Sequence, residues 1–99
     1  MRLEDRYTGL GIGKVCDAPL REPCRVAGEV QGIRVVPRAG SPSLEVTVSD
    51  GSGRAVAIFL GRRRIPGLDP GRGVVLEGVA RKEGQRMVLL NPAYTLLPQ

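Results

Sequence analysis

The chain of 99 residues contains no histidine and no tryptophan, and its only cysteines are Cys16 and Cys24. Without histidine and without a CxxC pair, the ligands of a zinc site are missing, so we predict that the protein binds no metal. A disulfide between the two cysteines is one alternative. Small buried thiols are the usual state of such residues in a cytosolic domain, and we favour that state.

Catalytic groups are missing as well. The sequence has no histidine to act as a base, no clear pair of carboxylates and no helix that could cradle a phosphate. The glycine-rich segment Gly9–Lys14 follows no predicted strand and lacks the P-loop spacing, so it is read as a loop. We therefore predict a protein that is not an enzyme and uses no cofactor.

Long apolar runs are absent. No stretch approaches the roughly 18 apolar residues that a membrane helix needs. Met1 is followed closely by the charged residues Glu4, Asp5 and Arg6, where a signal peptide would be apolar. These features predict a soluble, cytoplasmic protein with no membrane partner.

Aromatic residues are few, namely Tyr7, Phe59 and Tyr94, whereas the 14 glycines and 8 prolines indicate many turns. The hydrophobic fraction of 41% is enough for one core in a chain of this length. We expect two parts, an N-terminal arm over residues 1–23 and one β domain over residues 24–99. The arm is expected to be partly flexible, because glycines and prolines interrupt any regular structure in it. Within the arm, at most one short helical turn or strand is expected, around Ile12–Val15.

The positive charge is concentrated in the second half of the chain. The net charge of +5 arises after residue 53, because charges of both signs cancel before it. Eight cations there face only Asp69, Glu77 and Glu83. The eight cations are Arg54, Arg62, Arg63, Arg64, Arg72, Arg81, Lys82 and Arg86. Such one-sided charge is typical of a protein that binds a phosphate backbone, although a solubilising surface would look similar.

Alternation of apolar and polar residues predicts five strands, the first of them long and bent. They span residues 24–36, 43–49, 54–60, 73–81 and 86–90, and an extended piece with Tyr94, Leu96 and Leu97 follows. The alternation slips by one residue at Gly32 and again at Gly78. Glycines at such slips mark bulges or tight bends, so the strands are expected to close into a Greek-key barrel.

The connections follow from turn residues. Pro37–Pro42 and Lys82–Gln85 are read as hairpin loops and Asp50–Gly53 as a tight turn. In the connector Gly61–Gly71, two prolines forbid a long helix, and Ile65 and Leu68 are expected to plug the end of the barrel.

The faces of the middle strands follow from the same alternation. In the second strand Leu44, Val46 and Val48 are assigned to the interior. In the third strand the interior is assigned to Val56, Ile58 and Leu60. That assignment leaves Phe59 outside, beside Ala55 and Ala57, as an exposed aromatic side chain or one covered by the arm or a partner.

The order of these features resembles the oligonucleotide/oligosaccharide-binding fold (OB-fold). It is similar in particular to small bacterial OB-fold nucleic-acid-binding proteins and to the wedge domain of RecG-type helicases. The resemblance covers residues 24–97 and is carried by the Asp50–Gly53 turn, Pro70-Gly71 before the fourth strand, and the ending Asn91-Pro92-Ala93-Tyr94.

This resemblance implies that a single strand lies across the outer face of the second and third strands, between the loops Pro37–Pro42 and Lys82–Gln85. It implies no catalysis and little sequence specificity, with single-stranded or branched DNA favoured and RNA as an alternative. The expected backbone contacts are Arg34, Arg38, Arg54, Arg62, Arg63, Arg64, Arg81, Lys82 and Arg86, and Phe59 would stack a base. The alternative function is a docking or oligomerisation module of a larger complex, since a fold does not settle a function.

Overall fold

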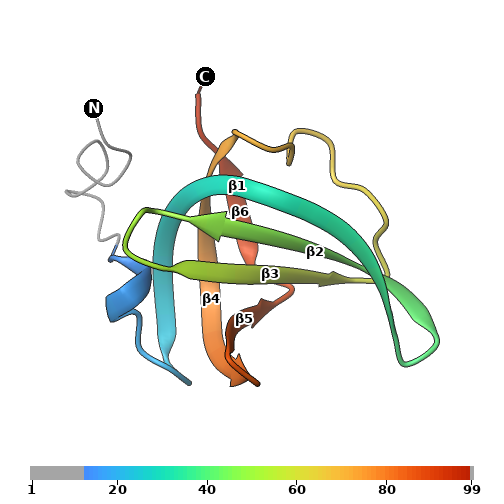
Figure 1. The fold of residues 1–99 in the computed structure, drawn as a ribbon, viewed down its shortest axis with the longest axis horizontal. Helices are drawn as coiled ribbons and strands as arrows, with labels where there is room; N and C mark the ends of the chain where they lie inside the picture. Colours follow the sequence, from blue (N-terminus) through green and yellow to red (C-terminus); the bar gives the residue numbers. More distant parts are fainter. Residues whose placement is uncertain (1–12, 99) are drawn as a thin grey trace.

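The computed structural model describes residues 13–98 and contains six strands, β1 (Pro23–Arg38), β2 (Ser41–Ser49), β3 (Arg54–Leu60), β4 (Gly73–Glu83), β5 (Arg86–Leu90) and β6 (Ala93–Leu96). A short 3-10 turn, η2 (Val15–Asp17), precedes them. The strands pair in the order β1-β2-β3-β5-β4, and β4 pairs with β1, so that five strands form a closed ring (Figure 1). This is the five-stranded Greek-key barrel of the OB-fold, as the sequence predicts.

The long strand β1 pairs with two other strands and arches across the barrel (Figure 1). Its first half pairs with β4 up to Glu29, and from Glu29 onward it pairs with β2. The register shifts between Val30 and Gly32, which confirms the bulge predicted at Gly32. Gly28 lies just before the change of neighbour, and a Cβ atom there would lie 2.8 Å from the carbonyl oxygen of Ser49. Only glycine allows β2 to approach this closely.

No bulge occurs at Gly78, although the sequence predicts a bulge or bend there. The pairing of β4 with β1 continues through Gly78 and Val79 without a register shift. Instead, the other edge of β4 changes partner at this position, because β6 pairs as far as Glu77 and β5 pairs from Ala80 onward. The slip in alternation therefore marks an exchange of neighbouring strands.

The assignment of faces in β3 is wrong. Ala55, Ala57 and Phe59 belong to the main core, with Phe59 only 6% exposed. Val56 and Ile58 belong to a second, smaller apolar cluster on the other side of the sheet. Every residue from Ala55 to Phe59 is buried, so alternation of polarity could not identify the inner side. In β2, by contrast, Leu44, Val46 and Val48 do face the main core as predicted.

The β1–β2 connection is much tighter than the six-residue loop predicted from its prolines. Only Ala39 and Gly40 lie outside the strands, with φ angles of 50° and 81°. Two consecutive positive φ angles are typical of the two-residue turns that join twisted strands. Pro37 and Pro42 pair across the hairpin, at its end, where the missing N–H groups disrupt little of the sheet.

The predicted turn at Asp50 and the predicted plug are both present. Asp50 Oδ1 accepts hydrogen bonds from Ser52 N–H and from Gly53 N–H. Ile65 and Leu68 are 3% and 2% exposed and pack into the main core.

Part of the N-terminal arm packs on the barrel. Val15 is buried in the main core, and its N–H donates to Asp50 Oδ2 at 2.9 Å. Gly13 forms a parallel bridge with Val26. Cys24 is a free, half-buried thiol whose pKa is raised by burial. Residues 1–12 of the arm, which include Tyr7 and most of Gly9–Lys14, lie outside the described residues. Over residues 13–98 no helix has the length and apolar character needed to cross a bilayer.

Candidate nucleic-acid interface

The outer side of β2, β3 and β5 forms one continuous face with the ends of β1 and β4. Cross-strand partners share a face, so the register shows which side chains lie there. This groove face carries Arg34 and Arg38 of β1, Glu45 and Thr47 of β2, Arg54, Val56, Ile58 and Leu60 of β3, Arg81 and Glu83 of β4, and Arg86, Val88 and Leu90 of β5. The second apolar cluster, Val56, Ile58 and Val88, is its buried floor.

Glu45 lies at the centre of this face and is almost fully buried, with its side chain 3% exposed. Its carboxylate accepts a hydrogen bond from Arg86 Nη1 at 2.8 Å and another from Arg34 Nε at 3.2 Å. Arg38 Nη1 lies 4.0 Å away. Burial alone would raise the pKa of Glu45, but the hydrogen bonds from Arg86 and Arg34 outweigh it and lower the pKa.

Glu83 joins the two hairpins that border the face. It lies at the end of β4, and its carboxylate takes two parallel hydrogen bonds from Arg38, at 3.0 and 2.8 Å. Arg86 donates a third hydrogen bond at 3.0 Å. The hydrogen bonds from Arg38, followed by those from Arg86, lower the pKa of Glu83 to about 2. The pKa values of both arginines are raised in return, so all these groups are charged near neutral pH.

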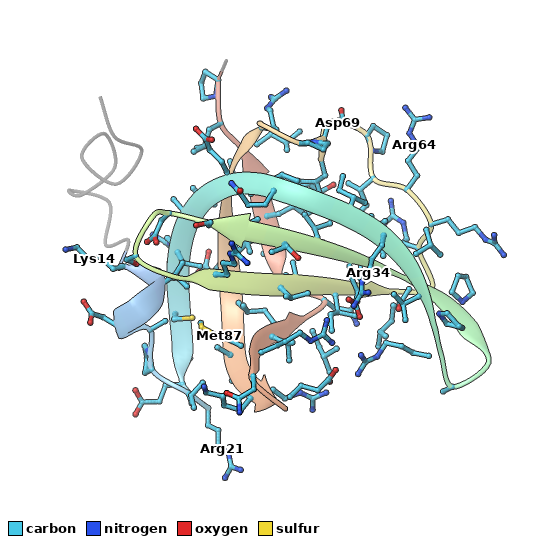
Figure 2. The ribbon with its side chains drawn as sticks, viewed as in Figure 1. Lys14, Arg21, Arg34, Arg64, Asp69 and Met87 are labelled. Carbon is cyan, nitrogen blue, oxygen red and sulfur yellow. The ribbon has the colours of Figure 1, made fainter. Side chains whose placement is uncertain are left out.

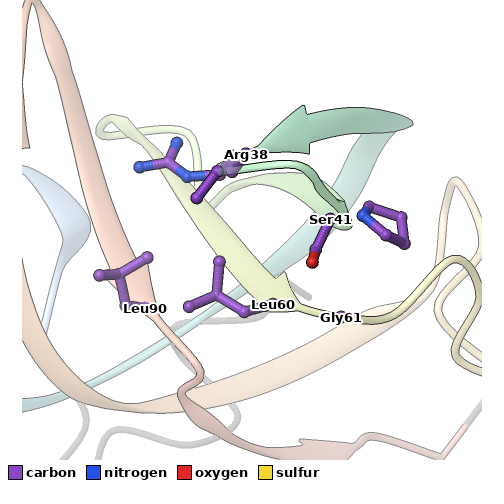
Figure 3. A pocket seen from close by; sticks show the side chains of 7 residues that line it. Arg38, Ser41, Leu60, Gly61 and Leu90 are labelled. Carbon is purple, nitrogen blue, oxygen red and sulfur yellow. The ribbon is translucent and has the colours of Figure 1, made fainter.

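A groove of about 500 Å³ opens at one end of this face, beside the β1–β2 hairpin (Figure 3). Leu60 and Leu90 line it from β3 and β5, and Arg38 borders it from β1. Ser41 and Pro42 complete the wall on the hairpin side. Leu60 is 45% exposed, which is unusual for a leucine at the end of a core strand. The groove therefore combines apolar walls with a cation and a hydroxyl.

The structure brings together only part of the predicted cations. Arg34, Arg38, Arg81 and Arg86 gather around the two glutamates. Arg54, at the far end of the groove face, lines a separate depression together with Lys82 and Met87. Phe59 is not on the groove face at all. Its ring packs inside the barrel, edge-to-face on Tyr94, so it does not offer the stacking surface that the sequence predicts.

Two arginines of the connector, Arg63 and Arg64, lie apart from the groove face. Arg63 lines a depression of about 290 Å³ with Val35 and Pro37. Val35 is the cross-strand partner of the core residue Leu44, so this depression is on the opposite side of the β1–β2 hairpin from Arg34. Arg62, Arg63 and Arg64 are exposed as predicted, and over residues 13–98 none of them forms an ion pair. Figure 2 shows Arg64 directed away from the barrel.

Sequence reasoning did not identify the two glutamates or the two leucines of this site. Its position between Leu44 and Val46 predicts that Glu45 faces outward, but its burial depends on arginines 11 residues before it and 41 after it. The sequence pattern predicts Leu90 only as the end of a strand, and it predicts Leu60 in the interior. One signal was available, because a charged residue between Leu44 and Val46 in a central strand needs a partner if it is buried.

Comparisons with known proteins support the fold. No family model matches the chain, and no curated protein does. Among solved structures, a chain of the S. pombe Stn1–Ten1 complex is similar, with a TM-score of 0.63 and 19% sequence identity. The similarity covers 100% of this chain and 77% of that chain. At this identity it concerns the fold, and it agrees with the closed five-stranded ring described above.

Proposed function

We propose that this protein binds single-stranded nucleic acid on the groove face, without catalysis and with little sequence preference. The observation that carries the proposal is the gathering of Arg34, Arg38, Arg81 and Arg86 on one outer face that also contains an apolar groove. These four cations exceed the two carboxylates among them, so the face attracts polyanions.

The two parts of the face suit the two parts of a nucleotide chain. Guanidinium groups bind backbone phosphates and release counterions, which provides affinity without reading sequence. The groove walls of Leu60, Leu90 and Pro42 can bury one unstacked base. Because Phe59 lies in the core, its ring offers no stacking surface on the groove face. We therefore expect weaker binding than in OB-folds with several exposed rings.

Single-stranded DNA is the favoured ligand, with RNA as the alternative. Discrimination between them rests on contacts to the 2′-hydroxyl, and Ser41 is the hydroxyl-bearing residue of the groove. Duplex DNA fits less well, because its bases are stacked and cannot enter a pocket of this kind.

Fluorescence anisotropy with labelled single-stranded DNA, single-stranded RNA and duplex DNA, repeated over a salt series, tests the proposal. We expect saturable binding to single strands whose log–log salt slope is about −0.7 per phosphate contacted. The variant Arg38→Gln/Arg86→Gln should bind more weakly. Lys14→Gln/Arg25→Gln removes the same charge elsewhere and serves as the matched control. Absence of binding at low salt, or equal loss in both variants, rejects the groove face as the site.

Protein docking is the second candidate function, and a separate observation favours it. The depression beside Arg63 has apolar walls, and Val35 within it is 49% exposed. Arg63 lies in its wall and forms no ion pair with the residues that the structure describes, so this surface suits an acidic segment with aliphatic side chains. A labelled peptide of alternating aspartate and leucine should bind the protein and should lose affinity in Val35→Asp. The S. pombe neighbour was crystallised as a complex of two proteins, which is compatible with this candidate.

A further inference from the structure

We propose that Glu83 occupies the place of a backbone phosphate, and that a nucleic-acid strand binds by displacing this carboxylate from Arg38 and Arg86. The inference rests on the proposed function and identifies one phosphate subsite within it. In the structure described here the subsite is filled by the protein's own anion.

The geometry of the contacts is that of an oxyanion site. Arg38 Nη1 and Nη2 bind the two oxygens of Glu83 in parallel, at 3.0 and 2.8 Å. Arg86 Nη2 approaches one of the same oxygens at 3.0 Å from another strand. Two guanidinium groups thus converge on one anion. Arginine binds carboxylates and phosphates with the same two-pronged arrangement, so a phosphate diester can take over these donors.

The two carboxylates of the network differ in how easily they can leave. Glu45 lies in the middle of β2 and is 3% exposed, whereas Glu83 is 33% exposed and precedes the β4–β5 turn at Gly84. Arg86 uses Nη1 for Glu45 and Nη2 for Glu83. Glu45 therefore keeps Arg86 in place when Glu83 moves away, and the Nη2 group becomes available to a phosphate.

The same contact also closes the face. Arg38 ends β1 and Glu83 ends β4, so their ion pair joins the two hairpins that border the bound strand in the proposed complex. The side chains of Arg38 and Glu83 are 27% and 33% exposed, so water screens their ion pair and a strand can compete for Arg38, but the released carboxylate then faces the phosphates. Glu83 therefore lowers the affinity for nucleic acid, because any strand that binds must first displace its carboxylate.

The test compares Glu83→Gln with wild-type protein in the anisotropy assay with single-stranded DNA. We expect the variant to bind about fivefold more tightly at low salt, which is the upper end of the effect of a solvent-exposed ion pair. Its salt slope should steepen by about 0.7, because one more phosphate displaces counterions. The gain should disappear in Arg38→Gln/Glu83→Gln. Glu77→Gln is the matched control, since it removes the same charge from a carboxylate that pairs with Arg25 at 3.2 Å on the β1–β4 side of the barrel.

Each outcome has a distinct meaning. Equal affinities of Glu83→Gln and wild type, with Arg38→Gln binding more weakly, reject the displaced carboxylate and keep the proposed function. Weaker binding by a folded Glu83→Gln also rejects it, because Glu83 would then only orient the arginines. If neither wild type nor Glu83→Gln binds, the proposed function itself fails. Circular dichroism at the assay temperature establishes that each variant is folded.

Discussion

The rings of Phe59 and Tyr94 meet edge-to-face, with their centroids 5.7 Å apart and their planes at 83°. Phe59 comes from β3 and Tyr94 from β6, the strand that follows the closed ring. The pair therefore attaches β6 to the interior of the barrel, and it makes the only phenylalanine of the chain a structural residue.

Phe59→Ala should lower the free energy of unfolding by about 3 to 5 kcal/mol, because it leaves a cavity in the core. Phe59→Leu keeps most of the volume and should lower it by about 1 kcal/mol. Urea denaturation measures both values. The folded Phe59→Leu protein should bind single-stranded DNA as wild type does. Loss of binding without loss of stability would restore Phe59 as a stacking residue.

Gly28→Ala should destabilise the barrel, because its new Cβ atom would lie 2.8 Å from Ser49 O, within the backbone of β2. We expect the free energy of unfolding to fall by about 1 to 3 kcal/mol, as in other overpacked sites. Gly32→Ala is the control on the same strand, since a Cβ atom there meets nothing within 4 Å. Its effect should stay within about 0.5 kcal/mol. Similar losses in the two variants would contradict the close approach of β2 at Gly28.

Acid should lower the free energy of unfolding over a defined range of pH. The pKa values of Glu45 and Glu83 are lowered in the folded state, that of Glu83 to about 2. Lowered pKa values stabilise the fold above the unfolded pKa of about 4.3, and this stabilisation is lost as the pH falls towards the folded values. Urea midpoints should therefore decrease between about pH 4.5 and pH 2, and less so in Glu83→Gln. A decrease of the same size in that variant would exclude Glu83 as a contributor.

Reversal of the charges of Arg62, Arg63 and Arg64 should reduce affinity equally for all sequences, because it removes a long-range attraction between these arginines and the phosphates. Arg63 lies on the other side of the hairpin and Arg64 points away from the barrel, so the effect should fade as salt rises and the Debye length shrinks to about 8 Å. The effect of Arg38→Gln/Arg86→Gln should persist further into the salt series, because these arginines contact phosphate directly. Unchanged binding in the triple variant at low salt would remove the connector arginines from the interface.

The sequence predicted the strands well, because turn residues and alternation determine where they begin and end. The OB-fold order, the bulge at Gly32 and the plug of Ile65 and Leu68 are confirmed. The prediction from sequence was wrong where a residue type is compatible with both a loop and a strand. Pro37 and Pro42 suggested a loop, but proline has an extended φ that suits the end of a hairpin.

The groove face was less predictable than the fold. Both faces of β3 are apolar, so the pattern of Ala55–Phe59 does not show which side chains point inward. The prediction therefore put the ring of Phe59 outside the barrel. The cations were read as unpaired charge. Glu45 and Glu83 in fact bind three of these cations, Arg34, Arg38 and Arg86. The paired residues are 11 to 45 positions apart in the sequence. Such pairings depend on the register and curvature of the finished barrel.

The parallel pairing of β3 with β5 has a consequence for how the barrel is made. It is the one junction of the ring between parallel strands, and β5 follows the other four ring strands in the chain. During synthesis the hairpins β1–β2 and β2–β3 can form early, whereas the edges of β3 and β4 stay open until Arg86–Leu90 has emerged from the ribosome. Open strand edges invite pairing with other chains. The five residues of β5 therefore end the period in which the nascent protein is prone to aggregate.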